Sequence, residues 1–177
     1  MNYSARNVGN SSLSKMLSNR ISTFISTLMD KKVLFVGLGN PLRNDDNVGI
    51  FFLELLEELD LPSCWELIKC YRNPENYLCE LLSSKSNIIV FIDSIQGTDQ
   101  DISILSEEEI KDFSFSTHTF GISTIIKYLK SSKDVNFFLI GIKPEKLEVG
   151  SGLTQATRRR AIFLFREFER ACKKAIG

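Results

Sequence analysis

The fold is decided by one glycine-rich stretch, Gly37-Leu38-Gly39-Asn40-Pro41-Leu42-Arg43-Asn44-Asp45-Asp46-Asn47-Val48-Gly49. An apolar run at residues 33–36 precedes it, which is typical of a strand that is covered on both faces. Gly37 and Gly39 permit a close approach of backbones or a positive φ, and Asn44 and Asn47 are non-glycine residues that tolerate a positive φ. Residues 50–58 mix apolar and acidic residues as a helix packed back on that strand does. The stretch therefore predicts a strand end, a tight turn and a helix start.

Strands and helices alternate through the rest of the chain. Further apolar runs of strand length lie at residues 65–70, 87–93, 102–105 and 135–142. Helical patterns follow the break at 73–76, the polar cluster at 116–119 and the cap at Thr154. The run at 102–105 is short, as edge strands are, and leads into an acidic turn at 106–109. This alternation predicts an α/β fold: a three-layer α/β/α sandwich with a mostly parallel central sheet and one antiparallel or edge strand.

We divide the chain into an N-terminal extension, residues 1–30, and a single α/β domain, residues 31–177. The extension contains an amphipathic helix ending near Asp30, whose apolar residues recur at helical spacing: Leu13, Met16, Leu17, Ile21, Phe24, Ile25, Leu28 and Met29. Three roles stay open for this helix. It covers an edge of the sheet, contacts a second copy of the chain in a homodimer, or lies on a membrane surface.

Composition argues against several classes of function. The 22 basic and 22 acidic side chains give a formal net charge of zero, which disfavours a nucleic-acid binder. The cluster Arg158-Arg159-Arg160 is expected to be a solvated helix face. No apolar run approaches the roughly 20 residues that span a bilayer. The four cysteines lack CxxC spacing, so we expect free thiols in a reducing cytoplasm rather than a zinc knuckle or disulfides.

Three polar residues stand where a doubly wound sheet brings chain segments together. Asp46 follows the first strand, Asp93 ends the third, and His118, the only histidine, stands at a helix entry. Two carboxylates and one neutral imidazole suit a borderline divalent ion such as nickel or zinc. Each residue also has a structural explanation, because Asp45 or Asp46 can cap a helix, Asp93 can close a turn, and a lone histidine is more often structural than catalytic.

Other catalytic patterns fit less well. Residues 37–39 lack the third glycine of a dinucleotide fingerprint, since Leu42 stands at that position. Cysteine–histidine nucleophilic catalysis would rest on Cys64, Cys70 or Cys79 without a supporting motif.

Taken in order, these motifs resemble the hydrogenase maturation endopeptidases, which trim the C-terminus of the large subunit of nickel-iron hydrogenases. The family's turn runs Gly-x-Gly-Asn, four residues, a paired acid and a further glycine, as residues 37–49 do. The resemblance continues at residues 73–76, 92–93, 118–122, 141–145 and 152–154, and covers roughly residues 32 to 175.

The resemblance implies an enzyme that senses nickel already loaded in the large-subunit precursor and then cleaves a short C-terminal extension. The family's nickel-contacting groups fall on Asp46, Asp93 and His118, the three residues already selected from the strand and helix ends. These residues are thus the expected catalytic and metal-binding set, with nickel sensed in the substrate and zinc as a surrogate. Activation of water by the bound ion is one route to cleavage.

The chain departs from the family pattern at two places. Asn44 and Asn47 replace glycines of the turn, a tolerable change if those positions need positive φ. Residues 69–72 read Lys-Cys-Tyr-Arg where the family has Asp-Gly-Gly-Thr or Ser. This loop has lost an acid and its glycines, so the substrate loop, the choice of precursor or activity itself can differ.

Two alternative functions stay open. Because the loop at residues 69–72 is altered, a non-catalytic nickel-binding assembly module is one alternative. Residues 36–41 also resemble the opening of bacterial peptidyl-tRNA hydrolases, but that family needs a histidine soon after the turn, and residues 42–117 contain none. The neutral charge argues against a tRNA substrate as well.

The metal-site hypothesis predicts the outcome of a calorimetric titration. If nickel or zinc binds to the purified chain, binding is expected to vanish in Asp46→Ala, Asp93→Ala and His118→Ala, because each removes one donor. If the wild type binds neither ion, the ion is recognised only inside the precursor or the site is not a metal site, and cleavage of the precursor decides. Binding retained in all three variants would contradict a shared site.

Overall fold

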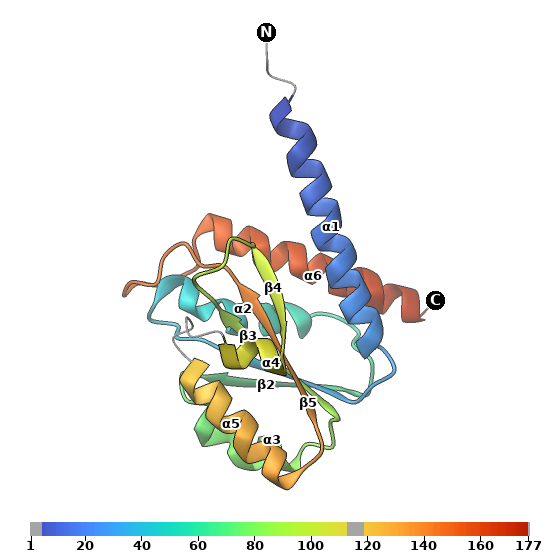
Figure 1. The fold of residues 1–177 in the computed structure, drawn as a ribbon, viewed down its shortest axis with the longest axis vertical. Helices are drawn as coiled ribbons and strands as arrows, with labels where there is room; N and C mark the ends of the chain where they lie inside the picture. Colours follow the sequence, from blue (N-terminus) through green and yellow to red (C-terminus); the bar gives the residue numbers. More distant parts are fainter. Residues whose placement is uncertain (1–4, 113–118, 177) are drawn as a thin grey trace.

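The computed structural model describes residues 5–112 and 119–176. Its centre is one five-stranded sheet with the strand order β2-β1-β3-β5-β4 (Figure 1). The strands are β1 (Val33–Leu38), β2 (Trp65–Tyr71), β3 (Ile88–Ser94), β4 (Ile102–Ser106) and β5 (Asn136–Ile142). The pairs β1–β2, β1–β3 and β3–β5 are parallel, and β4 pairs antiparallel with β5 at the edge. This confirms the predicted mostly parallel sheet with one antiparallel edge strand.

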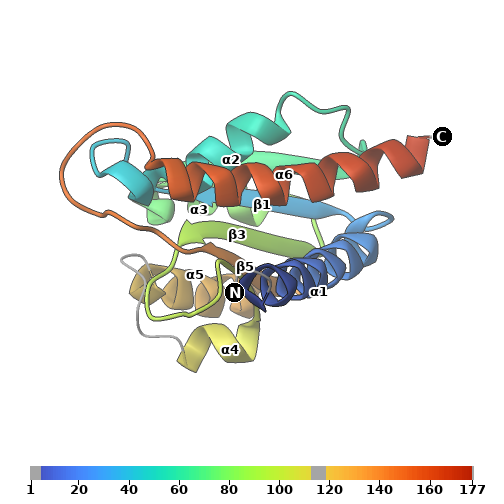
Figure 2. The ribbon, with the colours of Figure 1, turned by 90° about the horizontal axis from the view of Figure 1, so that it is seen from above.

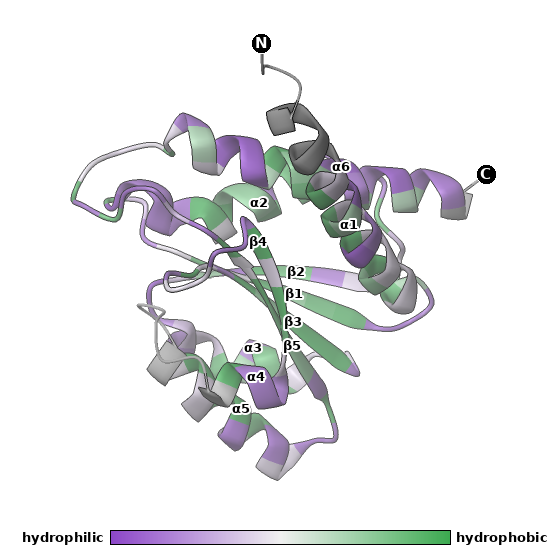
Figure 3. Cartoon of the chain, turned by 45° about the horizontal axis from the view of Figure 1, so that its top comes forward, coloured by the Kyte–Doolittle hydropathy of each residue, from purple (hydrophilic) through white to green (hydrophobic). Residues whose placement is uncertain are grey.

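Helices cover both faces of the sheet, which gives the three layers seen in Figure 3. One face carries α1 (Ala5–Leu28), α2 (Val48–Leu56) and α6 (Gln155–Ile176), and the other carries α3 (Leu78–Ser83), α4 (Glu107–Asp112) and α5 (Thr119–Ser132). Two short 3-10 helices, η1 (Asn44–Asn47) and η2 (Pro74–Tyr77), lead into α2 and α3. In Figure 2, α6 runs along the sheet beside α2.

The two faces of the sheet hold two separate apolar cores. Alternate residues of β1 belong to opposite cores, with Val33 and Phe35 in one and Leu34 and Val36 in the other. The first core is rich in aromatic rings that meet edge to face, and the Phe168 ring of α6 contacts those of Phe35, Phe52 and Trp65. The continuous apolar run of β1 is therefore explained by burial on both sides.

The predicted N-terminal helix is present and its second half belongs to the core. Ile21, Ile25 and Leu28 are fully buried together with residues of α2 and α6. The Arg20 guanidinium donates to the Ile104 carbonyl oxygen of the edge strand β4, at 3.2 Å. Of the three roles left open for this helix, the contacts favour covering the sheet beside its β4 edge. The first half of α1 projects beyond the body of the molecule in Figure 1.

The acidic turn predicted at residues 106–109 is wrong, because the helix α4 begins there. Ser106 and Glu109 form a reciprocal cap: the Ser106 backbone N–H donates to Glu109 Oε2 at 2.7 Å, and the Glu109 N–H donates to Ser106 Oγ at 3.5 Å. This pairing satisfies two amide groups at the helix start. A six-residue helix is too short for its apolar period to be recognised in the sequence.

Two glycines let the turn after β1 lie against the ends of the strands. A Cβ on Gly39 would stand 2.5 Å from the Asp46 carbonyl oxygen, and a Cβ on Gly49 would collide with the carbonyl oxygens of Leu38 and Ile92. Gly49 is therefore what allows the first turn of α2 to touch β1 and β3 at once. This contact fixes the position of Asp46, which lies two residues before that helix.

We expect Gly49→Ala to lower the free energy of unfolding by about 3 kcal/mol, because the added methyl group meets backbone atoms that cannot move aside. Gly121→Ala is the matched control, since nothing in the described chain lies within 4 Å of a Cβ built there on α5. Its expected effect is a gain of about 0.5 kcal/mol from better helix propensity. Urea unfolding of both variants measures the difference, and equal stabilities would contradict the proposed contact.

Candidate active site

The predicted carboxylates lie at the carboxyl end of the parallel strands, where the chain order reverses. From β1 the chain moves outward to β2 and then returns past β1 to β3, so the switch in direction falls between β1 and β3. Asp46 lies in η1 just after β1, and Asp93 lies at the end of β3. A crevice at such a switch point is the usual ligand position in open α/β sheets.

Ser94 links the two carboxylates. Its Oγ donates to Asp46 Oδ1 at 3.3 Å, and its backbone N–H donates to Asp93 Oδ1 at 2.8 Å. Asp93 is fully buried and Asp46 is 2% exposed. Ser94 is not among the residues predicted from the sequence. The signal available was its place directly after the strand-ending acid, where a hydroxyl group can reach a neighbouring loop.

The third predicted residue, His118, lies outside the described residues. Among residues 5–112 and 119–176, no three histidine, cysteine, aspartate or glutamate side chains form a metal-binding group. The described chain supplies the Asp46 and Asp93 carboxylates at this edge. Carboxylate oxygens are suitable donors for a divalent ion, so these two residues fit part of a metal-contacting set.

Asp45, the first of the acidic pair, has a structural role. Its carboxylate is fully buried and accepts hydrogen bonds from the backbone amides of Glu145, Lys146 and Thr154 and from the hydroxyl groups of Thr154 and Thr157, at 2.6 to 2.9 Å. Burial alone would raise the pKa of the Asp45 carboxyl, but the hydrogen bonds from those amides and from the Thr154 hydroxyl lower it below its ordinary value of 3.8.

Asp45 therefore ties the turn after β1 to the loop between β5 and α6, and to the start of α6. Thr154 caps that helix as predicted, with its Oγ1 accepting from the Thr157 N–H at 3.4 Å. The sequence left open whether Asp45 or Asp46 has only a structural role at a helix end, and it is Asp45 that has this role. Asp46 instead faces Ser94 and a cavity.

Asn44, Asn47 and Tyr71 stand near the site at positions where the family pattern has glycine, and two of the three have a positive φ. Asn44 has a φ of 39° and Tyr71 a φ of 52°, so both adopt the left-handed conformation. The family glycine that Asn44 replaces therefore stands at a position that needs positive φ, as expected. The same expectation is wrong for Asn47, whose φ is −85°.

Tyr71 lies in the altered loop, where the family pattern has glycine and this chain does not. The Tyr71 carbonyl oxygen accepts from the Gly39 N–H at 3.1 Å, and the pairing of β1 with β2 shifts register just before it. The loop keeps the shape that a glycine would allow, at a cost of about 1 to 2 kcal/mol for the left-handed conformation. The nearby Cys70 thiol is buried, which raises its pKa to about 12 and disfavours it as a nucleophile.

A cavity of about 460 Å³ opens beside Asp46. It is lined by Asn40, Leu42, Arg43, Asp46, Arg72, Asn73 and Val149. These residues come from the turn after β1, the altered loop after β2 and the loop before α6. The cavity is large enough to hold several residues of an extended peptide next to the Asp46 carboxylate.

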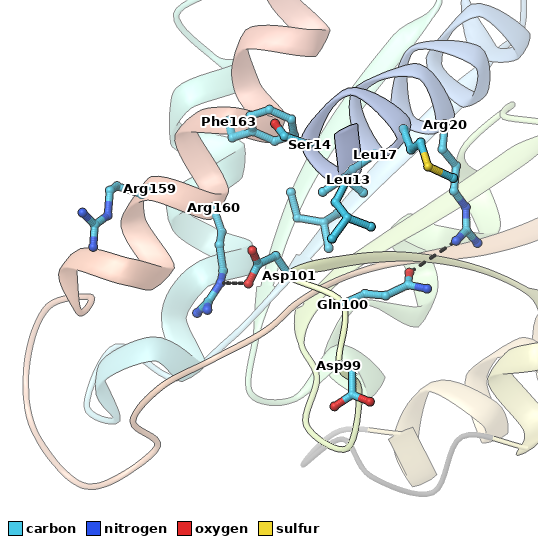
Figure 4. A pocket seen from close by; sticks show the side chains of 12 residues that line it. Leu13, Ser14, Leu17, Arg20, Asp99, Gln100, Asp101, Arg159, Arg160 and Phe163 are labelled. Carbon is cyan, nitrogen blue, oxygen red and sulfur yellow. Dashed lines mark hydrogen bonds and ion pairs between the residues drawn. The ribbon is translucent and has the colours of Figure 1, made fainter. Parts of the chain in front are cut away.

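A larger cavity, of about 680 Å³, lies elsewhere, between α1, α6 and the loop that joins β3 to β4 (Figure 4). None of the predicted site residues lines it. At its side Arg160 forms ion pairs of 2.6 Å with both Asp101 and Glu145. The expected solvated face at 158–160 is therefore wrong for Arg160, which joins α6 to two loops.

No helix of the described chain is long and apolar enough to cross a membrane.

Comparison with known proteins gives consistent results. A family model of hydrogenase maturation proteases matches residues 53–168. A protein of Methanocaldococcus jannaschii assigned as a hydrogenase maturation protease is 32% identical over 128 residues, which cover 67% of this chain and 75% of that protein.

Solved structures share the fold. The [NiFe] hydrogenase maturation protease of Thermococcus kodakarensis KOD1 is similar with a TM-score of 0.70 at 24% identity, over 81% of this chain and 94% of that one. The hydrogenase maturating endopeptidase of E. coli is similar with a TM-score of 0.69 at 22% identity, over 81% and 93% of the two chains.

We expect Asp45→Asn to lower the free energy of unfolding at pH 7 by about 2 to 4 kcal/mol, because an amide nitrogen would face buried donors. Asp60→Asn, on an exposed residue, is the control. Since the folded-state pKa of Asp45 is depressed, its stabilisation is complete above the ordinary value of 3.8 and is lost as the pH falls through the folded-state value. Urea unfolding between pH 7 and pH 2.5 should show the gap between wild type and Asp45→Asn closing at the acid end; a gap independent of pH would contradict this role.

Proposed function

Since this chain belongs to the hydrogenase maturation protease family, we propose that it removes a short C-terminal extension from the nickel-loaded precursor of a nickel-iron hydrogenase large subunit. Its role as an endopeptidase in hydrogenase maturation follows from that membership. The proposal concerns the substrate, its nickel ion and the residues that meet it. The observation that carries it is the placing of two buried carboxylates, Asp46 and Asp93, at the switch point of the sheet beside a peptide-sized cavity.

The nickel ion belongs to the substrate in this proposal. Asp46 would contact it from η1 and Asp93 from the end of β3, and His118 would provide an imidazole donor. The ion can polarise a peptide carbonyl or lower the pKa of a bound water. A precursor without nickel would lack the cation that the Asp46 and Asp93 carboxylates contact, so we expect it to bind less tightly. Recognition of the loaded precursor is thereby coupled to cleavage.

The remaining groups of the site position the carboxylates. Ser94 orients Asp46 through its hydroxyl group and Asp93 through its backbone amide. Asp45 keeps the turn that carries Asp46 against the loop before α6, so that the cavity wall stays in place. The precursor's C-terminal segment would lie in the 460 Å³ cavity, next to Asp46.

The alternatives from the sequence lose support. A peptidyl-tRNA hydrolase is disfavoured by the family match, and a non-catalytic assembly module is disfavoured because the family consists of proteases. The altered loop at residues 69–72 keeps the backbone shape of a glycine-containing loop, through the positive φ of Tyr71. Lys69, which stands at the place of the family's acid, pairs instead with Glu57 at 2.9 Å and does not line the cavity.

The test is cleavage of the nickel-iron hydrogenase large-subunit precursor from the same genome, produced with and without nickel. Wild-type protein is expected to shorten only the nickel-loaded form. Asp46→Asn and Asp93→Asn are expected to lower the rate by at least about 100-fold while leaving the fold intact, because each removes a charge but keeps the shape. Asp60→Asn is the control and should cleave normally.

Mass spectrometry of the product and circular dichroism of each variant separate loss of chemistry from loss of folding. Cleavage of the nickel-free precursor at the wild-type rate would rule out nickel sensing. Full activity of Asp46→Asn or Asp93→Asn would remove that residue from the site.

A further inference from the structure

Two large apolar side chains are exposed at the mouth of the candidate active-site cavity. Leu42 is 69% exposed and Val149 is 87% exposed, and both line the cavity that contains Asp46. Single exposed apolar residues are common on protein surfaces, but two that line one cavity give it an apolar wall that a side chain of a ligand can contact.

These two residues are held at a fixed separation by backbone hydrogen bonds. The Gly150 N–H donates to the Leu42 carbonyl oxygen at 2.9 Å, and the Asn44 N–H donates to the Gly150 carbonyl oxygen at 3.0 Å. Arg43 and Gly150 thereby form an isolated parallel bridge. In Figure 2 the orange loop before α6 curves around the light-blue turn after β1. The apolar pair is therefore pre-organised, so little conformational entropy is lost when a ligand binds.

The same cavity carries two guanidinium groups without ion-pair partners in the described chain. Arg43 and Arg72 are both exposed and line the cavity. Arg43 uses its Nε to donate to the Leu147 carbonyl oxygen at 3.0 Å, which leaves its terminal nitrogens available. The whole fork of Arg72 is available for a bidentate contact. An arginine fork matches the geometry of a carboxylate.

We propose that Leu42, Val149 and Arg72 form a specificity subsite that binds the precursor through one apolar side chain next to one carboxylate. The apolar side chain lies between Leu42 and Val149, and the carboxylate pairs with Arg72, with Arg43 adding positive charge nearby. This inference rests on the proposed function, because it names the part of the same substrate that the cavity recognises.

Arg72 makes this subsite a property of this particular chain. It stands in the altered loop, at the position where the family pattern has threonine or serine. The positive φ of Tyr71 turns the chain just before Arg72, which lines the cavity together with Asp46. Replacing a small hydroxyl group by a guanidinium in the cavity that Asp46 lines selects for a negatively charged substrate residue.

The first experiment measures steady-state cleavage of the nickel-loaded precursor. Arg72→Glu is expected to raise KM by about tenfold and to change kcat by less than about twofold, since the subsite binds substrate outside the reacting bond. Leu42→Ser and Val149→Ser are each expected to raise KM by about threefold or more, because their apolar contact is lost. Arg159→Glu makes the same change of charge on α6, outside this cavity, and should behave as wild type. A KM for Arg72→Glu within twofold of wild type would overturn the subsite.

A binding measurement keeps the inference separate from the proposed function. The peptides acetyl-Gly-Val-Glu-Gly-amide and acetyl-Gly-Val-Gln-Gly-amide are titrated into the 15N-labelled chain, and the Arg72 Nε–Hε signal is followed by NMR. Only the glutamate peptide is expected to shift that signal. If the wild-type protein cleaves no precursor, the proposed function fails and this titration alone decides the subsite. Equal shifts with both peptides, or none, would then overturn it.

Discussion

The candidate site depends on the burial of one charge, the Asp45 carboxylate. A buried carboxylate is costly unless its oxygens are hydrogen-bonded, and here three backbone amides and two hydroxyl groups supply those bonds. All of these donors come from the loop before α6 and the start of that helix. The turn after β1 can therefore be stable only while that loop is folded against it. The cavity wall, including Leu42 and Val149, follows from this pairing.

The two adjacent acids of the turn have different tasks because they face different sides of η1. Asp45 faces the loop before α6, whereas Asp46 faces Ser94 and the cavity. Because Asp45 holds the turn in place through its hydrogen bonds, the charge of Asp46 is not needed to stabilise the turn. The acidic pair of this chain thus combines a structural residue, Asp45, with one that lines the cavity, Asp46.

Much of the fold could be predicted from the sequence because strands that are buried on both faces consist of continuous apolar residues. The apolar runs of β1, β3 and β5 indicated a sheet covered on both faces, and the ends of parallel strands meet at one edge, which placed Asp46 and Asp93 together. The partners of Asp45 could not be predicted, since most are backbone amides and any residue type provides those. The positive φ of Tyr71 could not be predicted either, because tyrosine carries no preference for it. The cap of α4 was readable as Ser106-x-x-Glu109, but its acidic run looked like a turn.

The sequence distance between Asp45 and its partners has a consequence for how the chain folds during synthesis. Thr157 lies 112 residues beyond Asp45, and the nearest donor, Glu145, lies 100 residues beyond it. Contacts between residues so far apart form late, after the local elements have condensed. While the ribosome is still making β5, β1 and β3 can pair, yet the turn between β1 and α2 has no donors for its buried acid. The cavity wall that Asp45 supports is therefore completed only once the start of α6 has been made.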